Sequence, residues 1–154
     1  MLSYRRGDDV PLLNRTTGEQ LEYLANRWPN RPALVARHQG RRFSWAELLK
    51  EADDVARGLY ALGLQAGDRV GIWAVNCYEW VVIHFGCARA GIVVVSVSPA
   101  YRSHELAFVL RKSRMKTLFM YDHDERANYS EILMEALGSE RVPLEHTICF
   151  DSRA

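Results

Sequence analysis

Residues 68–102 constrain the fold more than any other stretch, because they combine two buried-strand patterns with one buried-helix pattern. Residues 70–75 form an almost unbroken apolar run, which is typical of a parallel strand covered on both faces. Residues 77–90 are apolar nearly all round and predict a buried helix that ends at Gly91. Residues 92–97 are a second β-branched run. We therefore predict a right-handed βαβ unit around which the remaining chain folds.

Polar residues near the predicted helix starts show the spacing of capping boxes. In such a box a Ser, Thr or Asn side chain and a Glu or Gln three residues later each bond the other's backbone. The pairs with this spacing are Thr17–Gln20, Ser44–Glu47 and Asn76–Glu79. Ser103 is expected to cap a further helix, with Glu105 in its first turn and basic residues at its end, as the helix dipole favours.

Strand and helix patterns alternate through the rest of the chain. Residues 33–37 and 41–44 flank His38-Gln39-Gly40 and predict a β-hairpin. The other predicted helices cover residues 17–28, 44–62, 103–114 and 129–137, and the other predicted strands cover 117–121 and 147–150. The fold class is therefore α/β, with βαβ units, a mainly parallel sheet and an N-terminal hairpin.

Composition narrows the class of protein further. The chain has 154 residues, 48% apolar and 25% charged, as expected of one soluble globular domain. Its net charge of +1 argues against a nucleic-acid binder, which would carry a clustered basic face. The N-terminus lacks the apolar core of a secretory signal, and the longest apolar helix is too short for a membrane span and contains His84 and Arg89. Three cysteines without paired spacing predict free thiols, and we expect a cytoplasmic protein.

The common nucleotide-binding signatures are absent from the sequence. A G-x-G-x-x-G loop needs two glycines two positions apart, and no two of the ten glycines have that spacing. No glycine precedes a lysine, which excludes a Walker loop. Thr16-Thr17-Gly18 is similar to part of a phosphate loop but lacks the surrounding glycine and lysine, so Thr17 is better explained as a helix cap.

Ligands of an open parallel sheet bind beyond the carboxyl ends of its strands. Here those ends are Asn76-Cys77, Ser98-Pro99-Ala100-Tyr101 and Asp122-His123-Asp124-Glu125. The last segment contains residue types that bind metals, but consecutive loop residues rarely converge on one ion. A solvated loop is therefore the favoured interpretation, with ligand contact as the alternative.

Two other clusters also have a structural and a functional interpretation. His84 and Cys87 lie one helical turn apart, as zinc ligands can, yet no second pair accompanies them and core packing is favoured. The basic residues are interpreted as a helix end that faces water, with phosphate contact as the alternative; they are Arg111, Lys112, Arg114 and Lys116. We assign no catalytic, cofactor-binding or metal-binding residue in this chain.

Two segments resemble conserved blocks of a known superfamily. FSWAEL at residues 43–48, followed by LGL at 62–64 and GDRV at 67–70, resembles the first block of the adenylate-forming (AMP-binding) superfamily of acyl-CoA synthetases. AGIVVVSVSPAYR at residues 90–102 resembles the second block. The match extends in order from about Leu12 to Tyr129 and is similar to the medium-chain fatty acyl-CoA ligase branch. Ser98 stands where that branch has Asn, and we expect its hydroxyl to keep the turn by bonding a nearby backbone amide.

The resemblance implies part of a longer enzyme. Members activate a carboxylic acid with ATP to an acyl-adenylate and pass it to coenzyme A, and ATP, Mg²⁺, coenzyme A and a fatty acid are implied for the full-length enzyme. The family's phosphate loop, adenine segment, ribose-binding Asp and C-terminal Lys have no counterpart here, so no cofactor is expected in this chain. We expect residues 1–15 to be an extended lead-in. Residues 16–154 are expected to be an incomplete N-terminal subdomain, inactive alone, whose partner is the remainder of the synthetase or a second copy.

Two alternatives stay open at this point. The first is a stand-alone binding or regulatory module that kept the fold and lost the chemistry. The second is an unrelated receiver-like α/β protein, which is weaker because only Asp122 and Asp124 fit its acidic site loosely. A subdomain of a synthetase is expected to expose an apolar surface where the missing part docks.

Overall fold

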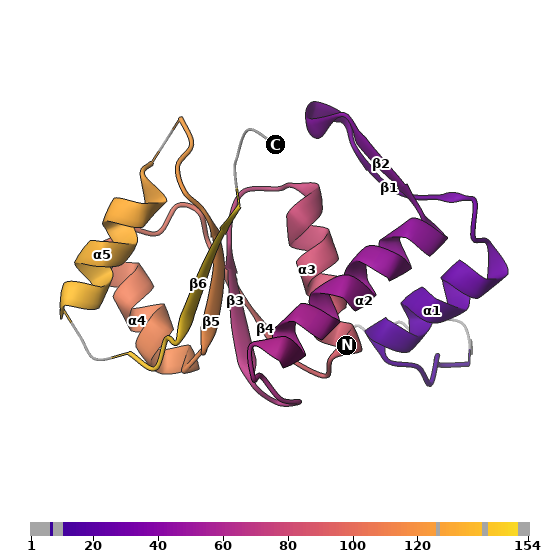
Figure 1. Cartoon of the computed structure of the whole chain (residues 1–154), viewed down its shortest axis with the longest axis horizontal. Coiled ribbons are helices and arrows are strands. Elements are labelled where there is room, and N and C mark those ends of the chain that lie inside the picture. Colours follow the sequence, from indigo (N-terminus) through magenta and orange to yellow (C-terminus); the bar gives the residue numbers. More distant parts are fainter. Residues whose placement is uncertain (1–6, 8–10, 126, 140–141, 151–154) are drawn as a thin grey trace, which may run out of the picture.

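The computed structural model describes residues 7, 11–125, 127–139 and 142–150. Its elements alternate as the sequence predicts (Figure 1). In chain order they are α1 (Thr17–Arg27), β1 (Pro32–Ala36), the 3-10 turn η1 (Arg37–Gln39), β2 (Arg41–Ser44), α2 (Trp45–Ala61), β3 (Arg69–Trp73), α3 (Tyr78–Arg89), β4 (Val93–Val97), α4 (Ser103–Ser113), β5 (Thr117–Tyr121), α5 (Tyr129–Ser139) and β6 (His146–Phe150). Much of the expected lead-in, residues 1–6 and 8–10, lies outside the described residues, while residues 11–15 form neither helix nor strand.

Four parallel strands form one sheet in the order β4-β3-β5-β6. β3 pairs with β4 on one side, where Trp73 lies opposite Val97, and with β5 on the other, where Trp73 lies opposite Met120. β6 pairs with β5 in the same direction. Because β3, α3 and β4 are consecutive and the two strands are parallel, the predicted βαβ unit is confirmed.

Helices cover both faces of this sheet, as a parallel sheet requires (Figure 1). On one face α4 and α5 pack over Trp73 and Met120, which are both fully buried. On the other face α2 and α3 pack over Val70 and Ile72, also fully buried. Residues of β3 thus alternate between two apolar clusters, which explains why its sequence is apolar almost throughout.

The β1–β2 hairpin and α1 lie beside the sheet, against α2 and α3 (Figure 1). The hairpin is antiparallel, as predicted, and Gly40 turns it with a φ of 64°. Arg89 of α3 ties α1 and α2 together, because its Nε donates to Asp53 and its Nη1 donates to Glu22, both at 2.7 Å. These bonds, with that to Asp53 foremost, raise the pKa of Arg89.

The cap of α1 is one residue earlier than the sequence predicted. Thr16, not Thr17, is the cap, and its hydroxyl accepts from the N–H of Glu19 at 3.2 Å. The Glu19 carboxylate accepts from the N–H of Thr16 at 2.7 Å. The pairs Thr16–Glu19 and Thr17–Gln20 both have the required spacing. The charged carboxylate of Glu19 accepts a backbone hydrogen bond more strongly than the amide of Gln20 does.

The capping box of α2 is the predicted one. Ser44 donates its N–H to Glu47 at 2.8 Å, and the Ser44 hydroxyl accepts from the N–H of Glu47 at 3.3 Å. At α4 the cap is Arg102, whose N–H donates to Glu105 at 3.1 Å, so Ser103 is the first helical residue rather than the cap.

The thiols have the predicted free state, with Cys77 and Cys87 buried and Cys149 exposed. Among the described residues, no helix has the length and apolar character needed to cross a membrane.

Candidate functional site

The strand order places a topological switch point between β3 and β5. From β3 the chain first adds β4 on one side and then adds β5 and β6 on the other. Doubly wound sheets bind ligands beyond the carboxyl ends of the two strands at such a point. A hollow of about 530 Å³ lies there, lined by His38, Gln39, Val75, Asn76, Tyr121, His123, Asp124 and Glu125. This switch-point hollow is the candidate site.

Two of the three predicted strand ends meet in the switch-point hollow. Asn76 follows β3 and residues 123–125 follow β5, whereas residues 98–101, which follow β4, are not among the lining residues. Sequence reasoning missed His38 and Gln39, which line the hollow from the hairpin tip. No local pattern marks them, because only the packing of the hairpin against α3 makes them neighbours of the strand ends.

Gln39 fixes the hairpin to the start of α3. Its Nε2 donates to both carboxylate oxygens of Glu79, at 2.9 and 3.2 Å, and its Oε1 accepts from the N–H of Tyr78 at 2.8 Å. The predicted Asn76–Glu79 capping box is therefore wrong. The cap is Cys77, which makes no side-chain cap bond. A free N–H of the first helical turn is satisfied by Gln39 from the hairpin instead of by a local side chain.

The loop after β5 uses its carboxylates to hold its own shape. Asp124 accepts from the N–H of Ala127 at 3.0 Å and from the hydroxyl of Tyr129 at 2.8 Å. Asp122 accepts from the N–H of His123 at 2.8 Å, the foremost of the contacts that lower the pKa of Asp122. The predicted loop at residues 122–125 is confirmed. No group of three or more His, Cys, Asp or Glu side chains that could hold a metal ion occurs in the described ranges.

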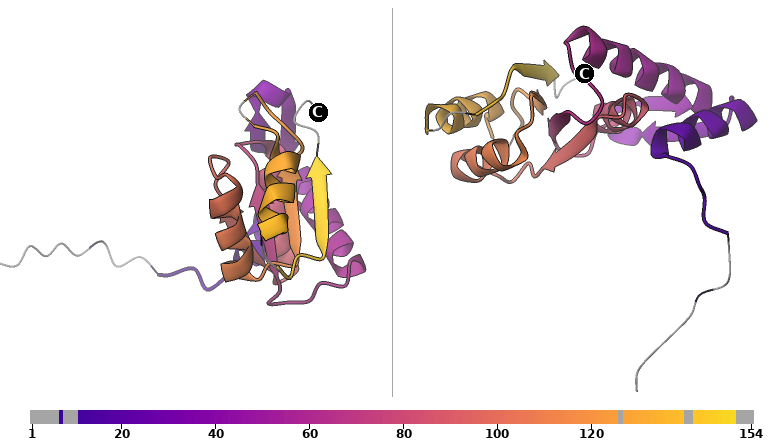
Figure 2. Two further views of the ribbon diagram at one scale, coloured as in Figure 1. Left: turned by 90° about the vertical axis from the view of Figure 1, so that its left-hand side faces the viewer. Right: turned by 90° about the horizontal axis from the view of Figure 1, so that it is seen from below.

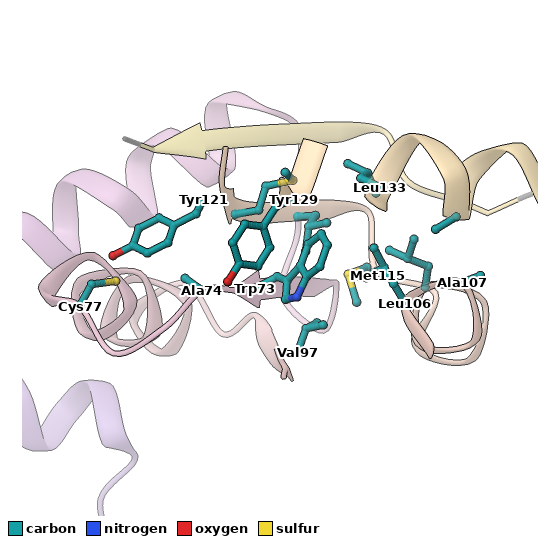
Figure 3. Close-up of a cluster of buried hydrophobic side chains, with 14 residues drawn as sticks. Trp73, Ala74, Cys77, Val97, Leu106, Ala107, Met115, Tyr121, Tyr129 and Leu133 are labelled. Atoms are coloured by element: carbon teal, nitrogen blue, oxygen red, sulfur yellow. The ribbon is translucent and has the colours of Figure 1, made fainter. Parts of the chain in front are cut away.

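Tyr121, one of the lining residues of the hollow, is buried beside Cys77, which does not itself line the hollow. The hydroxyl of Tyr121 points to the sulfur of Cys77 (Figure 3). Burial is the foremost cause that raises the pKa of both groups. The thiolate, not the thiol, is the nucleophile, so a Cys77 with a raised pKa is unsuited to nucleophilic catalysis at neutral pH.

The proline turn after β4 has the expected local bonds. The hydroxyl of Ser98 accepts from the N–H of Ala100 at 3.3 Å, and its carbonyl accepts from the N–H of Tyr101 at 3.1 Å. The indole Nε1 of Trp73 donates to the same carbonyl at 3.0 Å. Serine therefore keeps the turn where the resembling branch has asparagine, and Trp73 ties that turn to the central strand.

The remaining sequence candidates take part in packing and ion pairing. The ring of His84 stacks on Trp80 with the centroids 5.4 Å apart. Cys87 is fully buried, and burial raises its pKa to about 12. Lys116 of the basic cluster lies 2.9 Å from Asp68 at the start of the sheet. These contacts support core packing for His84 and Cys87. Lys116 differs from the prediction, because it lies beyond the end of α4 and pairs with Asp68 instead of belonging to a helix end that faces water.

Comparison with known families decides the relationship of the chain. The family model described as "AMP-binding enzyme" matches residues 21–153. The chain belongs to the AMP-binding enzyme family. The medium-chain acyl-CoA ligase ACSF2, mitochondrial, of Rattus norvegicus is 43% identical over 92% of this chain and 25% of its own length. The chain therefore spans about a quarter of the length of that curated relative.

Solved structures of AMP-binding enzymes have the same fold. The fatty acyl CoA synthetase of Mycobacterium tuberculosis matches with a TM-score of 0.77 at 25% identity, over 88% of this chain and 26% of that one. The N-terminal domain of FACL13 from the same organism matches with a TM-score of 0.79 at 24% identity, over 90% of this chain and 34% of that one. This AMP-binding chain thus has the fold of part of the N-terminal domain of acyl-CoA ligases, as the sequence blocks predicted.

Proposed function

We propose that this chain is the N-terminal scaffold portion of an ATP-dependent fatty acid–CoA ligase. The complete enzyme would convert a carboxylate to an acyl-adenylate and then to an acyl-CoA, with ATP, Mg²⁺ and coenzyme A as cofactor and cosubstrates. The observation that carries this proposal is the 43% identity, over 92% of the chain, to a medium-chain acyl-CoA ligase. The cytoplasmic location stays a prediction, and the rat relative is named as mitochondrial.

The polar groups of the switch-point hollow support a scaffold role for residues 16–154. Gln39 and Asp124 are engaged in bonds that join the hairpin, α3 and the loop after β5. Cys77 and Tyr121 keep their protons at neutral pH because burial raises the pKa of each. We infer that the isolated chain holds elements in place and does not catalyse adenylation.

A chimera tests the proposal. The matching quarter of the rat ligase is replaced by this chain, and formation of octanoyl-CoA from octanoate, ATP and coenzyme A is measured. We expect the chimera to be an active ligase and the isolated chain to be inactive. A folded chimera without ligase activity would count against the proposal. Tight binding of coenzyme A by the isolated chain would favour the stand-alone module instead.

A further inference from the structure

Trp73, the last residue of β3, connects the central strand to the turn after β4. Its indole is fully buried under α4 and α5, which lie side by side on this face of the sheet (Figure 2). Its Nε1 donates to the carbonyl of Ser98 at 3.0 Å, and the N–H of Tyr101 donates to the same oxygen at 3.1 Å. Ser98 follows Val97, the register partner of Trp73 on β4. The turn beyond β4 is therefore bonded to a side chain of the neighbouring strand.

Tyr129, the first residue of α5, connects Trp73 to the loop after β5. The two rings meet edge to face, with centroids 4.8 Å apart and planes at 82° (Figure 3). Both side chains are buried in the same apolar cluster. The hydroxyl of Tyr129 donates to Asp124 at 2.8 Å, and Asp124 lines the switch-point hollow. One aromatic pair therefore links the turn after β4 to a wall of the hollow.

The polar atoms of this aromatic pair are more than core packing requires. Leu106 and Leu110 fill the same cluster with apolar side chains alone. Phenylalanine at position 73 or 129 would also add apolar area, but it would lack the indole N–H or the phenol hydroxyl. Both donors reach segments beyond the carboxyl ends of strands, where open parallel sheets bind ligands. Supporting hydrogen bonds of this kind hold the residues of a binding site in place.

We propose that Trp73 and Tyr129 are positioning residues of the ligase. Together they fix the spacing between residues 98–101 and residues 122–125 around a substrate that binds at the switch point. This inference rests on the proposed function. The pair acts through its two hydrogen bonds and does not itself touch the substrate. Loss of either donor frees one of the two segments to shift, and small shifts of binding groups weaken interactions that depend on their geometry.

Trp73→Phe and Tyr129→Phe in the rat-ligase chimera test the proposal, because each variant removes one donor and keeps an aromatic ring. The KM values for octanoate, ATP and coenzyme A are measured from initial rates well below the melting temperature. We expect each variant to raise KM for the same substrate by roughly 3- to 10-fold, as the loss of one ordinary hydrogen bond would. Partial unfolding lowers the amount of active enzyme and therefore the apparent kcat, whereas KM reports on the folded site.

Leu110→Val is the matched control for a loss of packing. It removes apolar volume from the same cluster near the C-terminal end of α4, away from the turn that precedes that helix. It should lower the melting temperature and leave each KM within about 1.5-fold of the parent value. The double variant Trp73→Phe/Tyr129→Phe is the second control. If the two residues act as one unit, its rise in KM should be smaller than the product of the two single rises.

The outcomes separate this inference from the proposed function. An active chimera in which Tyr129→Phe changes no KM would overturn the inference and leave the proposed function standing. Because Tyr129→Phe removes a single oxygen atom, it decides the question even if Trp73→Phe does not fold. A double variant whose rise in KM equals the product of the single rises, or an equal rise at Leu110→Val, would also overturn the inference. An inactive parent chimera counts against the proposed function, and the inference would fall with it.

Discussion

At the scale of single residues, Gly86 sets how closely α2 and α3 approach. A Cβ placed on Gly86 would lie 2.5 Å from Cγ1 of Val55 and 3.1 Å from the carbonyl oxygen of Ala52. Val55 is β-branched and stiff at χ1, so it cannot turn aside cheaply. We expect Gly86→Ala to lower the free energy of unfolding by roughly 1–3 kcal/mol, as overpacking does in dense cores. Urea unfolding of the isolated chain measures this loss.

Gly58 of α2 is the matched control for Gly86. A Cβ there meets no atom within 4 Å, so Gly58→Ala should raise the free energy of unfolding by roughly 0.5–1 kcal/mol through helix propensity alone. Val55→Ala, added to Gly86→Ala, should recover little of the loss, because it removes Cγ1 but keeps Cβ of residue 55, which would lie 2.6 Å from the added Cβ. Equal stability of Gly86→Ala and the parent chain would contradict the close approach of the two helices.

The role of a residue could be predicted from the sequence where its hydrogen-bond partner lies only a few positions away along the chain. Ser44 and Glu47 satisfy each other within four residues, so their spacing alone was sufficient. Thr16 and Thr17 offered two equivalent spacings, and the choice depended on the stronger acceptor at Glu19. The role of Gln39 could not be predicted from the sequence, because its partners lie 39 and 40 positions away along the chain.

At the scale of elements, Gln39 joins the hairpin to α3. A substitution that changes its charge should therefore weaken the contact between these two elements. Gln39→Glu places a second carboxylate against Glu79 and removes the two bonds that Nε2 donates. We expect the free energy of unfolding to fall by roughly 1–3 kcal/mol. We also expect the backbone N–H of Tyr78 to exchange faster with deuterium, as mass spectrometry of the first turn of α3 can record.

The double variant Gln39→Glu/Glu79→Gln is the control for that prediction. It restores one amide donor opposite one carboxylate, so most of the lost stability and hydrogen-exchange protection should return. If the double variant is as unstable as Gln39→Glu alone, the contact between Gln39 and Glu79 does not hold the hairpin to α3.

Asp68 and Lys116 join the starts of β3 and β5, and their pair predicts a pH dependence. The bond from Lys116, and then that from the N–H of Gln65, lower the pKa of Asp68. A lowered carboxylate pKa means that the stabilisation is complete above about pH 4, the ordinary Asp value, and is lost as the pH falls through the lowered pKa. Asp68→Asn should therefore be most destabilising near neutral pH, and its effect should shrink in acid.

The test measures the free energy of unfolding in urea, between pH 7 and pH 3, for the parent chain and for Asp68→Asn. Lys116→Gln is the control background, in which the pH dependence contributed by Asp68 should be smaller. A destabilisation by Asp68→Asn that stays constant over the whole range would show that the charge of Asp68 does not stabilise the fold.

The elements with a strong periodic signal could be predicted from the sequence. The order of the strands in the sheet could not. The segments that form β3 and β4 are apolar because both faces of each strand are covered. Their burial can therefore be predicted from the sequence of each segment alone. The order β4-β3-β5-β6 depends on the side of the sheet to which each helical connection returns the chain. The sequence of a single strand does not indicate that order. The switch-point hollow follows from that order, so its lining could be predicted only in part.

At the scale of the whole molecule, the fold presents the topological switch point at which open parallel sheets bind ligands. Among the lining residues of the switch-point hollow, Asp124 supports the loop after β5, and the phenol of Tyr121 stays protonated at neutral pH. The chain also spans a quarter of the length of a 43% identical ligase. The proposed role as the N-terminal scaffold portion of a ligase accounts for both observations.

Octanoate-dependent ATP–pyrophosphate exchange, measured side by side for the isolated chain and the rat-ligase chimera, tests this account most directly. Exchange reports formation of the acyl-adenylate alone, before coenzyme A takes part. The account predicts no exchange above the protein-free blank for the isolated chain, and octanoate-dependent exchange for the chimera. Exchange catalysed by the isolated chain, or a folded chimera that catalyses none, would contradict it.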